Sequence, residues 1–262
     1  MLTRDRTRFA AALRFALASH GDQKRKGTPI PYVSHLLQVA GLVLEYGGDA
    51  DQAIAGLLHD AIEDCPGVSE AGLRRRFGPE VARIVRAASD VLEGDTPRRR
   101  SPWLRRKLRF IAHLRGQDAR VRLVTACDKL DNLRSLLADL HADGPETLAR
   151  FRGTPAQIRW YYEEVRDALG RELPRRLSRE LDLLVAELAH FVPRASPRAD
   201  PARRRPAARA RRSRTRPARG PSGSSSMPSG PGAEKTLTAA PGGAARARRR
   251  SARRGGPAPS AR

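Results

Sequence analysis

Four ionisable side chains lie within six consecutive residues, at His59, Asp60, Glu63 and Asp64. On a helix, residues four apart share a face, so His59 lies beside Glu63 and Asp60 beside Asp64. The apolar pair 57–58 directly before them favours burial, which is unfavourable for charged groups unless they bind a metal or take part in a reaction. Taken alone, the Glu63–Asp64 pair fits a solvated helix end better.

Two further candidates lie far away in the sequence. His35 stands at the start of a predicted helix, where a lone histidine more often has a structural role. Asp128 lies in the middle of a helical stretch, and Asn132, four residues later, shares its face. A charged stripe usually marks the solvated side of a helix, but apolar residues bracket this one closely on both sides.

The candidate metal ligands supply two imidazoles and two carboxylates, from His35, His59, Asp60 and Asp128. This mixed set of nitrogen and oxygen donors suits Mn²⁺, Fe²⁺ or Zn²⁺ and suits Ca²⁺ or Cu⁺ poorly. Ligands from three helices can converge in a helical bundle. Glu63 and Asp64 follow about one turn later, where a carboxylate can orient or deprotonate a water molecule.

Helical periodicity extends over residues 3–192 and predicts the elements that position these groups. No segment alternates with period two, so little or no sheet is expected. Glycine, proline and capping residues divide the chain into segments. We expect a first helix before a polar loop at 21–31, a second helix ending at Gly47-Gly48 and a third over about 51–64. A short helix should follow from the cap Ser69 to Phe77, and another should begin at Pro79 and end before a loop at 93–101. The remaining helices are expected over about 102–115, 118–140, 155–169 and 174–191.

Apolar positions predict which faces of these helices point inward. In the first, second and last helices they are Phe9, Leu13, Ala16 and Leu17; Leu36, Val39, Ala40, Val43 and Leu44; and Leu181, Leu184, Val185 and Leu188. The predicted fold class is all-α, a bundle of about eight to ten helices within a domain of residues 1–193.

Three ordered motifs resemble the HD superfamily of phosphohydrolases, and within it the hydrolase domain of RelA/SpoT-type (p)ppGpp hydrolases. The resemblance covers about residues 6–170 and is closest to the small stand-alone alarmone hydrolases, which are similar to the metazoan SpoT homologue. It rests on residues 20–27 with 31–35, on Leu57-Leu58-His59-Asp60-Ala61-Ile62-Glu63-Asp64, and on Asp128-Lys129-Leu130-Asp131-Asn132-Leu133-Arg134.

This resemblance implies an HD-domain helical bundle and a role for each candidate residue. It implies that the four ligands hold one Mn²⁺, while Glu63 and Asp64 activate the water that cleaves a 3′-pyrophosphate. The implied substrate contacts are Arg25 and Lys26 on the guanine side, Asn132 at the ribose, Ser135 and Tyr161.

The chain departs from the family pattern at Leu36, where proline is usual, at Asp131, where histidine or tyrosine is usual, and in a more basic segment at 97–107. These departures do not affect the four candidate metal ligands, but they leave more than one substrate possible. The alternatives are an HD phosphohydrolase of another nucleotide or small phosphate ester, because fold and metal do not fix the substrate, and a non-enzymatic polyanion-binding protein.

Most of the positive charge belongs to the last part of the chain. The net charge is +23, yet residues 194–262 hold 19 basic and 2 acidic residues, while the preceding residues hold 32 and 26. This Arg/Pro/Ala/Gly-rich tail has too few apolar residues to fold, so we expect it to be disordered. We expect a solvated extension without specific function, with nonspecific polyanion contact as the alternative.

The two cysteines, Cys65 and Cys127, are far apart and form no CxxC pair, which argues against a disulfide framework and a zinc–thiolate site. A reducing cytoplasm is the expected compartment. The first residues lack the apolar run of a signal peptide, and no stretch of about 18 apolar residues predicts a membrane span.

Deleting residues 194–262 should leave the thermal unfolding midpoint and kcat/KM nearly unchanged, because every candidate site residue precedes the tail. If the tail binds polyanions, the full-length chain should shift RNA or DNA in low salt, and the truncated chain should not. Loss of folding or of hydrolase activity on truncation would show that the boundary at residue 193 is wrong.

Overall fold

The computed structural model describes residues 2–91, 101–170 and 172–193. The chain divides into two units, residues 1–206 and 207–262, and all described residues belong to the first. The predicted tail at 194–262 and nearly all of the predicted loop at 93–101 lie outside the described residues. The domain boundary at residue 193 therefore stays a prediction.

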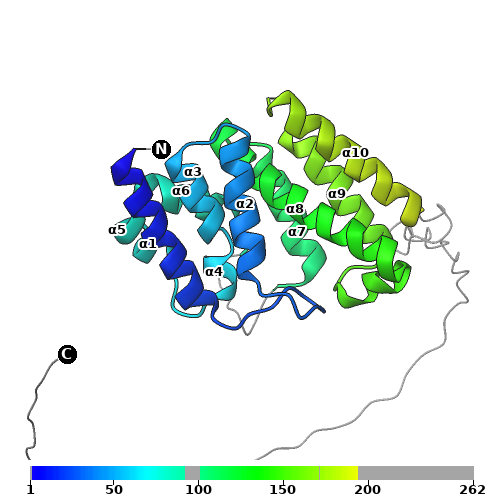
Figure 1. Ribbon diagram of the computed structural model, residues 1–262. Coiled ribbons are helices and arrows are strands. Elements are labelled where there is room, and N and C mark those ends of the chain that lie inside the picture. The colour runs from blue at the N-terminus through cyan, green and yellow to red at the C-terminus, as the bar shows by residue number, and fades with distance from the viewer. Residues whose placement is uncertain (1, 92–100, 171, 194–262) are drawn as a thin grey trace, which may run out of the picture. The chain divides into compact units, whose positions relative to one another are not determined.

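The described residues form ten α-helices, one 3-10 helix and no strand, which confirms the predicted all-α class (Figure 1). No helix among them is long and apolar enough to cross a membrane. The helices are α1 (Thr3–His20), α2 (Val33–Glu45), α3 (Ala50–Leu58), α4 (Ala61–Asp64), α5 (Glu70–Phe77), α6 (Pro79–Ala88), α7 (Trp103–Leu114), α8 (Ala119–Asp143), η1 (Pro145–Arg150), α9 (Pro155–Leu169) and α10 (Arg175–Phe191).

Two helices organise the packing. The short helix α3 contacts α1, α2, α6 and α8, and the long helix α8 also contacts α2, α9, α10 and η1 (Figure 1). Both are heavily buried: seven of the nine residues of α3 lie in the core, from Gln52 to Leu58. Side chains at the end of α3 and in the middle of α8 are therefore held rigidly on several sides.

Local capping explains where several helices begin. The Ser69 hydroxyl accepts a hydrogen bond from the Gly72 amide at the start of α5, as the sequence predicts. Thr154 caps α9 through the Gln157 amide, and Pro155 follows at the first helical position.

The predicted helix over 51–64 is wrong in one respect, because it is interrupted. Helix α3 ends at Leu58, and the separate short helix α4 begins at Ala61, so His59 and Asp60 lie in the turn between them. The prediction that Leu17 and Leu44 face inward is also wrong, since these side chains are 48% and 42% exposed. Both lie at the edge of an apolar stripe that is narrower than the sequence pattern suggests.

Helices α2 and α3 approach closely at Gly56. A Cβ atom on Gly56 would lie 3.3 Å from the Ala40 Cα atom and 3.4 Å from a Val39 methyl carbon. Glycine and alanine thus bring together the two helices that carry His35 and lead into His59.

Replacing Gly56 with valine should destabilise the protein by about 1–3 kcal/mol, because the added methyl groups must push α2 away from α3. Gly41→Val is the matched control: Gly41 is an exposed α2 residue with nothing within 4 Å of its Cβ position. Its effect should be neutral or slightly stabilising, because glycine is the poorer helix former. Urea unfolding measures both variants, and equal midpoints would contradict the proposed close approach.

Candidate metal centre

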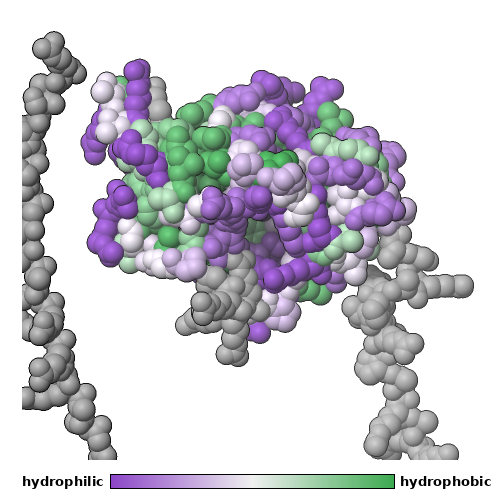
Figure 2. All heavy atoms as spheres, turned by 60° about the horizontal axis from the view of Figure 1, so that its bottom comes forward, coloured by the Kyte–Doolittle hydropathy of each residue, from purple (hydrophilic) through white to green (hydrophobic). Residues whose placement is uncertain are grey.

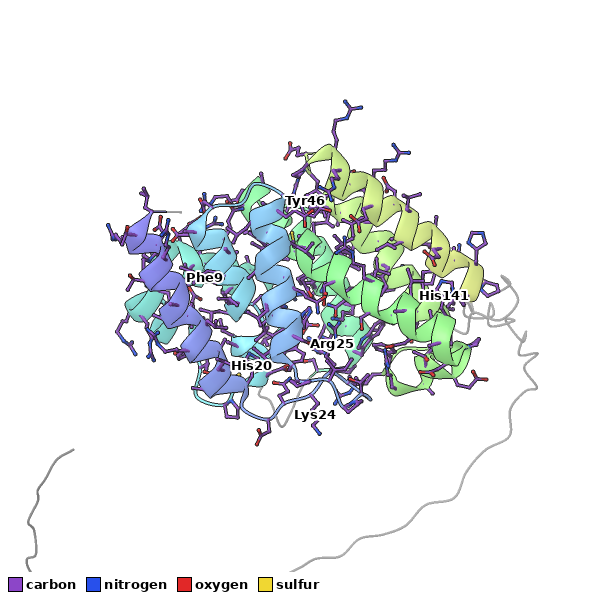
Figure 3. All side chains as sticks on the ribbon, in the orientation of Figure 1. Phe9, His20, Lys24, Arg25, Tyr46 and His141 are labelled. Atoms are coloured by element: carbon purple, nitrogen blue, oxygen red, sulfur yellow. The ribbon has the colours of Figure 1, made fainter. Side chains whose placement is uncertain are left out.

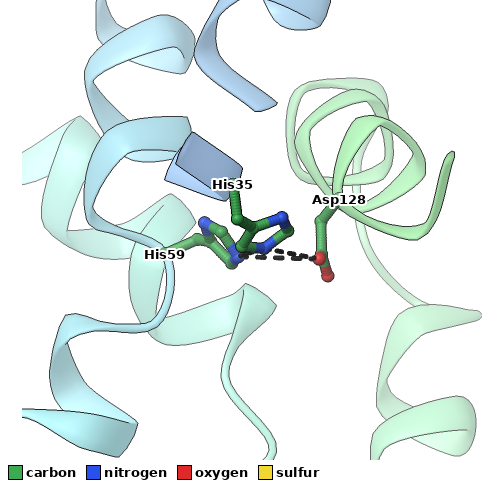
Figure 4. A group of neighbouring side chains, drawn as sticks. All are labelled: His35, His59 and Asp128. Atoms are coloured by element: carbon green, nitrogen blue, oxygen red, sulfur yellow. Dashed lines mark hydrogen bonds and ion pairs between the residues drawn. The ribbon is translucent and has the colours of Figure 1, made fainter. Parts of the chain in front are cut away.

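Three of the candidate ligands converge from separate parts of the fold. His35 extends from the first turn of α2, His59 from the turn after α3 and Asp128 from the middle of α8 (Figure 4). Their ligating atoms all lie within 4.8 Å of one another, and all three residues are buried. The His35 Nε2 atom lies 3.2 Å from His59 Nε2 and 3.4 Å from Asp128 Oδ1.

The fourth candidate, Asp60, is adjacent to both imidazoles. Its Oδ2 atom lies 3.0 Å from His59 Nε2 and 3.8 Å from His35 Nε2. The same oxygen accepts a hydrogen bond from the Tyr32 hydroxyl, which fixes the carboxylate from the side of the loop before α2. The helix break at residues 59 and 60 lets two consecutive side chains face the same point.

Hydrogen bonds behind the rings assign their tautomers. The His59 Nδ1 atom lies 2.8 Å from the Gly56 carbonyl oxygen, which can only accept, so Nδ1 carries the proton. The His35 Nδ1 atom lies 2.6 Å from the Asp131 carboxylate and likewise donates. In the neutral rings, both Nε2 atoms therefore present lone pairs to each other and to two carboxylate oxygens. This donor set fits a divalent cation.

The electrostatics of the cluster also favour a positive charge at its centre. Burial lowers the pKa of the His59 imidazole, but the carboxylates of Asp60 and Asp128 outweigh it and hold the pKa well above its usual value. For Asp128, burial alone would raise the pKa, yet Lys129 and His59 hold it well below its usual range. A metal ion would have to displace protons from this site, which makes its affinity pH-dependent.

The residues that orient the ligands include some that sequence reasoning missed. Asp131 holds His35, and the sequence marked it only as a departure from the family pattern. The Asn132 amide donates to Asp128 Oδ1 at 2.5 Å. The Arg25 guanidinium donates to Asp131 Oδ2 at 2.8 Å and lies 3.5 Å from the Asn132 amide oxygen. No short-range sequence signal links residue 25 to residue 131.

A cavity of about 580 Å³ opens next to these ligands, a volume suited to a small molecule such as a nucleotide. Figure 2 turns this side of the molecule forward and shows hydrophilic residues gathered on it. The cavity brings together seven of the predicted site residues, which are Asp60, Glu63, Asp64, Asp128, Lys26, Asn132 and Tyr161. His35 and His59 lie buried behind the carboxylates, and Arg25 and Ser135 are not among the lining residues.

Glu63 faces the cavity in an environment that favours its protonated form. Burial, with the nearby charges of Asp90 and Asp60, raises the pKa of its carboxyl group to about 7. Its Oε1 atom accepts hydrogen bonds from the Asp90 amide at 2.7 Å and from the Ser89 hydroxyl at 3.3 Å. A carboxylate with a pKa near neutrality can exchange protons with a reacting water. Asp64 accepts a hydrogen bond from the Gln23 amide at 3.0 Å.

A second residue that sequence reasoning missed, Asp90, supports Glu63 directly. Asp90, directly after α6, is buried and pairs with both Arg106 and Lys107 of α7. Burial alone would raise the pKa of Asp90, but the two cations lower it, so the carboxylate stays charged. Asp90 is thereby fixed where its backbone amide reaches Glu63.

The rest of the cavity wall is cationic and aromatic. Five basic side chains line it, from Lys26, Arg106, Lys107, Lys129 and Arg152, together with aromatic rings from Tyr32, Trp103, Phe110, Phe151 and Tyr161. The buried Tyr161 hydroxyl has no hydrogen-bond partner among the described residues. Basic and aromatic groups suit a ligand with phosphates and a planar ring.

Comparison with known proteins shows which family the chain belongs to. The family model described as an HD domain matches residues 12–151, more than half of the chain. A guanosine-3′,5′-bis(diphosphate) 3′-pyrophosphohydrolase from Aquifex aeolicus is 36% identical over 125 residues, which are 48% of this chain and 17% of that protein. A probable enzyme of the same name from Synechocystis is 30% identical over 179 residues, or 19% of its length. The chain thus spans less than a fifth of these bacterial relatives.

Shorter relatives match over most of their length. The guanosine-3′,5′-bis(diphosphate) 3′-pyrophosphohydrolase MESH1 of Drosophila melanogaster is 32% identical over 139 residues, which cover 73% of it. A solved structure described as a metazoan orthologue of SpoT that hydrolyses ppGpp superposes with a TM-score of 0.55 and 28% identity, covering 69% of this chain and 94% of the other. The resemblance predicted from the motifs is confirmed, and the chain belongs to the HD-domain family.

Proposed function

We propose that this HD-domain protein is a metal-dependent hydrolase that removes pyrophosphate from the 3′ position of (p)ppGpp. The observation that carries the proposal is the convergence of two imidazoles and two carboxylates next to Glu63, beside a cavity lined by both carboxylates and basic side chains. The names of the homologous 3′-pyrophosphohydrolases support the choice of substrate. We assign the activity to residues 1–193.

The reaction needs a nucleophilic water, a base and stabilisation of phosphate charge. When bound, a divalent ion would supply Lewis-acid polarisation of the phosphoryl oxygens. Glu63 accepts a proton as the water oxygen attacks the phosphorus attached to the ribose 3′ oxygen. The bond between this phosphorus and the 3′ oxygen breaks, the 3′ oxygen gains a proton, and pyrophosphate leaves. Asp64, held by Gln23, orients the water beside Glu63.

The metal we propose is Mn²⁺, with His35, His59, Asp60 and Asp128 as ligands. Two imidazoles and two carboxylates fit Mn²⁺, Fe²⁺ and Zn²⁺. Oxygen donors make up half of this set, which suits the harder Mn²⁺ ion.

The cavity wall provides the contacts for the nucleotide. Lys107 and Lys129 lie close to the Tyr161 ring, with Nζ atoms 4.7 Å and 5.8 Å from its centroid, and so can pair with phosphates near the metal site. The unpartnered Tyr161 hydroxyl can donate to a phosphate or ribose oxygen. Lys26 lies over the Phe151 ring and can pair with a phosphate or the base edge. Asn132 also lines the cavity and can contact the ribose of the nucleotide.

A second candidate is hydrolysis of another nucleotide or small phosphate ester by the same site. The observation that favours it is the position of Arg25, which pairs with Asp131 instead of lining the cavity where the resemblance expects a guanine contact. Either reaction would belong in the cytoplasm, where nucleotides are abundant and the two buried thiols stay reduced.

A panel assay tests the substrate. Full-length protein with Mn²⁺ should convert ppGpp to GDP and pyrophosphate faster than it acts on ATP, GTP or a simple phosphate ester, with products identified by chromatography. Asp60→Ala should abolish both Mn²⁺ binding and turnover, because it removes a ligand. Turnover of another ester in the absence of any ppGpp hydrolysis would favour the second candidate.

The pH dependence tests the role of Glu63. Its carboxyl group has a pKa of about 7 and must be deprotonated to act as a base, so kcat should rise with pH through about 7 and level off above it. Glu63→Gln should lower kcat by about 10²-fold or more and remove this rise, while Mn²⁺ still binds. Wild-type activity in Glu63→Gln would exclude Glu63 from the mechanism.

A further inference from the structure

Arg25 lies in the loop between α1 and α2, at the end of the bundle near the metal site (Figure 3). Its side chain is only 11% exposed. The guanidinium forms an ion pair with Asp131 at 2.8 Å and lies 3.5 Å from the Asn132 amide oxygen. Arg25 is thus largely buried, and it is not among the residues that line the cavity.

The two α8 residues that Arg25 contacts each hold one metal-ligand candidate. Asp131 accepts from the His35 Nδ1–H group at 2.6 Å, and Asn132 donates to Asp128 Oδ1 at 2.5 Å. The guanidinium therefore spans the two side chains that orient an imidazole from α2 and a carboxylate from α8. Consecutive residues on a helix point about 100° apart, so bridging them takes a planar group with several donors.

We propose that Arg25 is a positioning residue of the metal centre, acting through Asp131 on His35 and through Asn132 on Asp128, and is not a substrate contact. This inference rests on the metal site of the proposed function. It assigns Arg25 a different role from the guanine contact that the resemblance implies.

The loop around Arg25 is built to hold it in place. The Arg25 amide donates to the Ile30 carbonyl at 2.9 Å, and the Thr28 amide donates back to the Arg25 carbonyl at 3.0 Å. Gly27 has a φ of +73°, and a Cβ atom there would lie 2.8 Å from the Arg150 side chain, so the turn also packs against η1. The backbone thus directs one basic side chain inward to α8.

The next residue, Lys26, provides the contrast. Its Nζ atom lies 5.5 Å from the centre of the Phe151 ring, and it lines the cavity. Arg25 and Lys26 carry the same charge and are adjacent in the chain, yet one faces the ligand supports and the other faces the substrate space. Replacing either residue with alanine removes one positive charge, but only the Arg25 substitution removes a group that contacts Asp131 and Asn132. The two substitutions are therefore matched controls for each other.

A double-mutant cycle on the full-length chain tests the proposal, with the Mn²⁺ dissociation constant measured by calorimetry. Asp131→Ala should raise the Kd by about 10- to 100-fold, because His35 loses the acceptor that orients it. Arg25→Ala should raise it by about 5- to 10-fold in the wild-type background and by only about 2- to 3-fold in the Asp131→Ala background, because only the path through Asn132 then remains. Lys26→Ala should leave the Kd within about 2-fold.

Two further measurements separate positioning from substrate binding. At saturating Mn²⁺, Arg25→Ala should keep the KM for ppGpp within about 2-fold, whereas Lys26→Ala should raise it. In the metal-free protein, at a pH high enough to keep both rings neutral, ¹⁵N imidazole signals should show the Nδ1–H tautomer of His35, and Arg25→Ala should broaden or shift them while leaving those of His59 unchanged. Should Asp131→Ala not fold, Asp131→Asn replaces it, because asparagine keeps the volume and loses the charge.

Equal effects of Arg25→Ala in the two backgrounds, or a change confined to KM, would overturn the positioning role. A wild-type protein that binds no Mn²⁺ would overturn both the metal site and this inference. A protein that binds Mn²⁺ and shows the coupling, but does not hydrolyse ppGpp, would support the inference and reject only the proposed substrate.

Discussion

When both rings are neutral, the Nε2 lone pairs of His35 and His59 face each other across 3.2 Å, and this arrangement constrains the rest of the structure. Lone pairs at that distance repel unless a cation lies among them, so the protein must hold both rings from behind. The Gly56 carbonyl does this for His59, and Asp131 does it for His35. The first bond is local to the end of α3, whereas the second needs α8 to lie against α2. The packing of these three helices is therefore also the condition for binding a metal.

Charge balance extends the same constraint outward. Asp128 is buried, and Lys129 contacts it at 2.5 Å, while Arg25 pairs with buried Asp131. Asp90 is buried with Arg106 and Lys107 in the same way. A buried carboxylate without a partner would take up a proton or destabilise the fold. The cations thus keep the buried carboxylates ionised, and those that line the cavity also give its wall positive charge.

Local signals in the sequence were sufficient for the helices and for the family. Capping residues and prolines predicted where α5, α6 and α9 begin, and the resemblance of three motifs to a known family predicted the HD domain. The break between α3 and α4 was not predictable from periodicity, because a helix through residue 64 would show the same apolar pattern. The partners of Asp131 and Asp90 were also missed, since a salt bridge between residues 25 and 131 depends on how distant helices pack.

The position of Glu63 shows how a helical fold can adjust the pKa of one carboxyl group. Burial raises the pKa of Glu63 and so favours its protonated form, and a protonated carboxyl group cannot accept a proton from water. The Asp90 amide stabilises the ionised form through a 2.7 Å hydrogen bond, and Lys107 lowers the pKa further, while the charges of Asp90 and Asp60 oppose this. These opposing effects leave the pKa at about 7, where both protonation states are accessible. Asp90 therefore acts on the pKa of Glu63 in two opposite ways: its charge raises the pKa, and its backbone amide lowers it. The ion pairs with Arg106 and Lys107 of α7 hold Asp90 in this position.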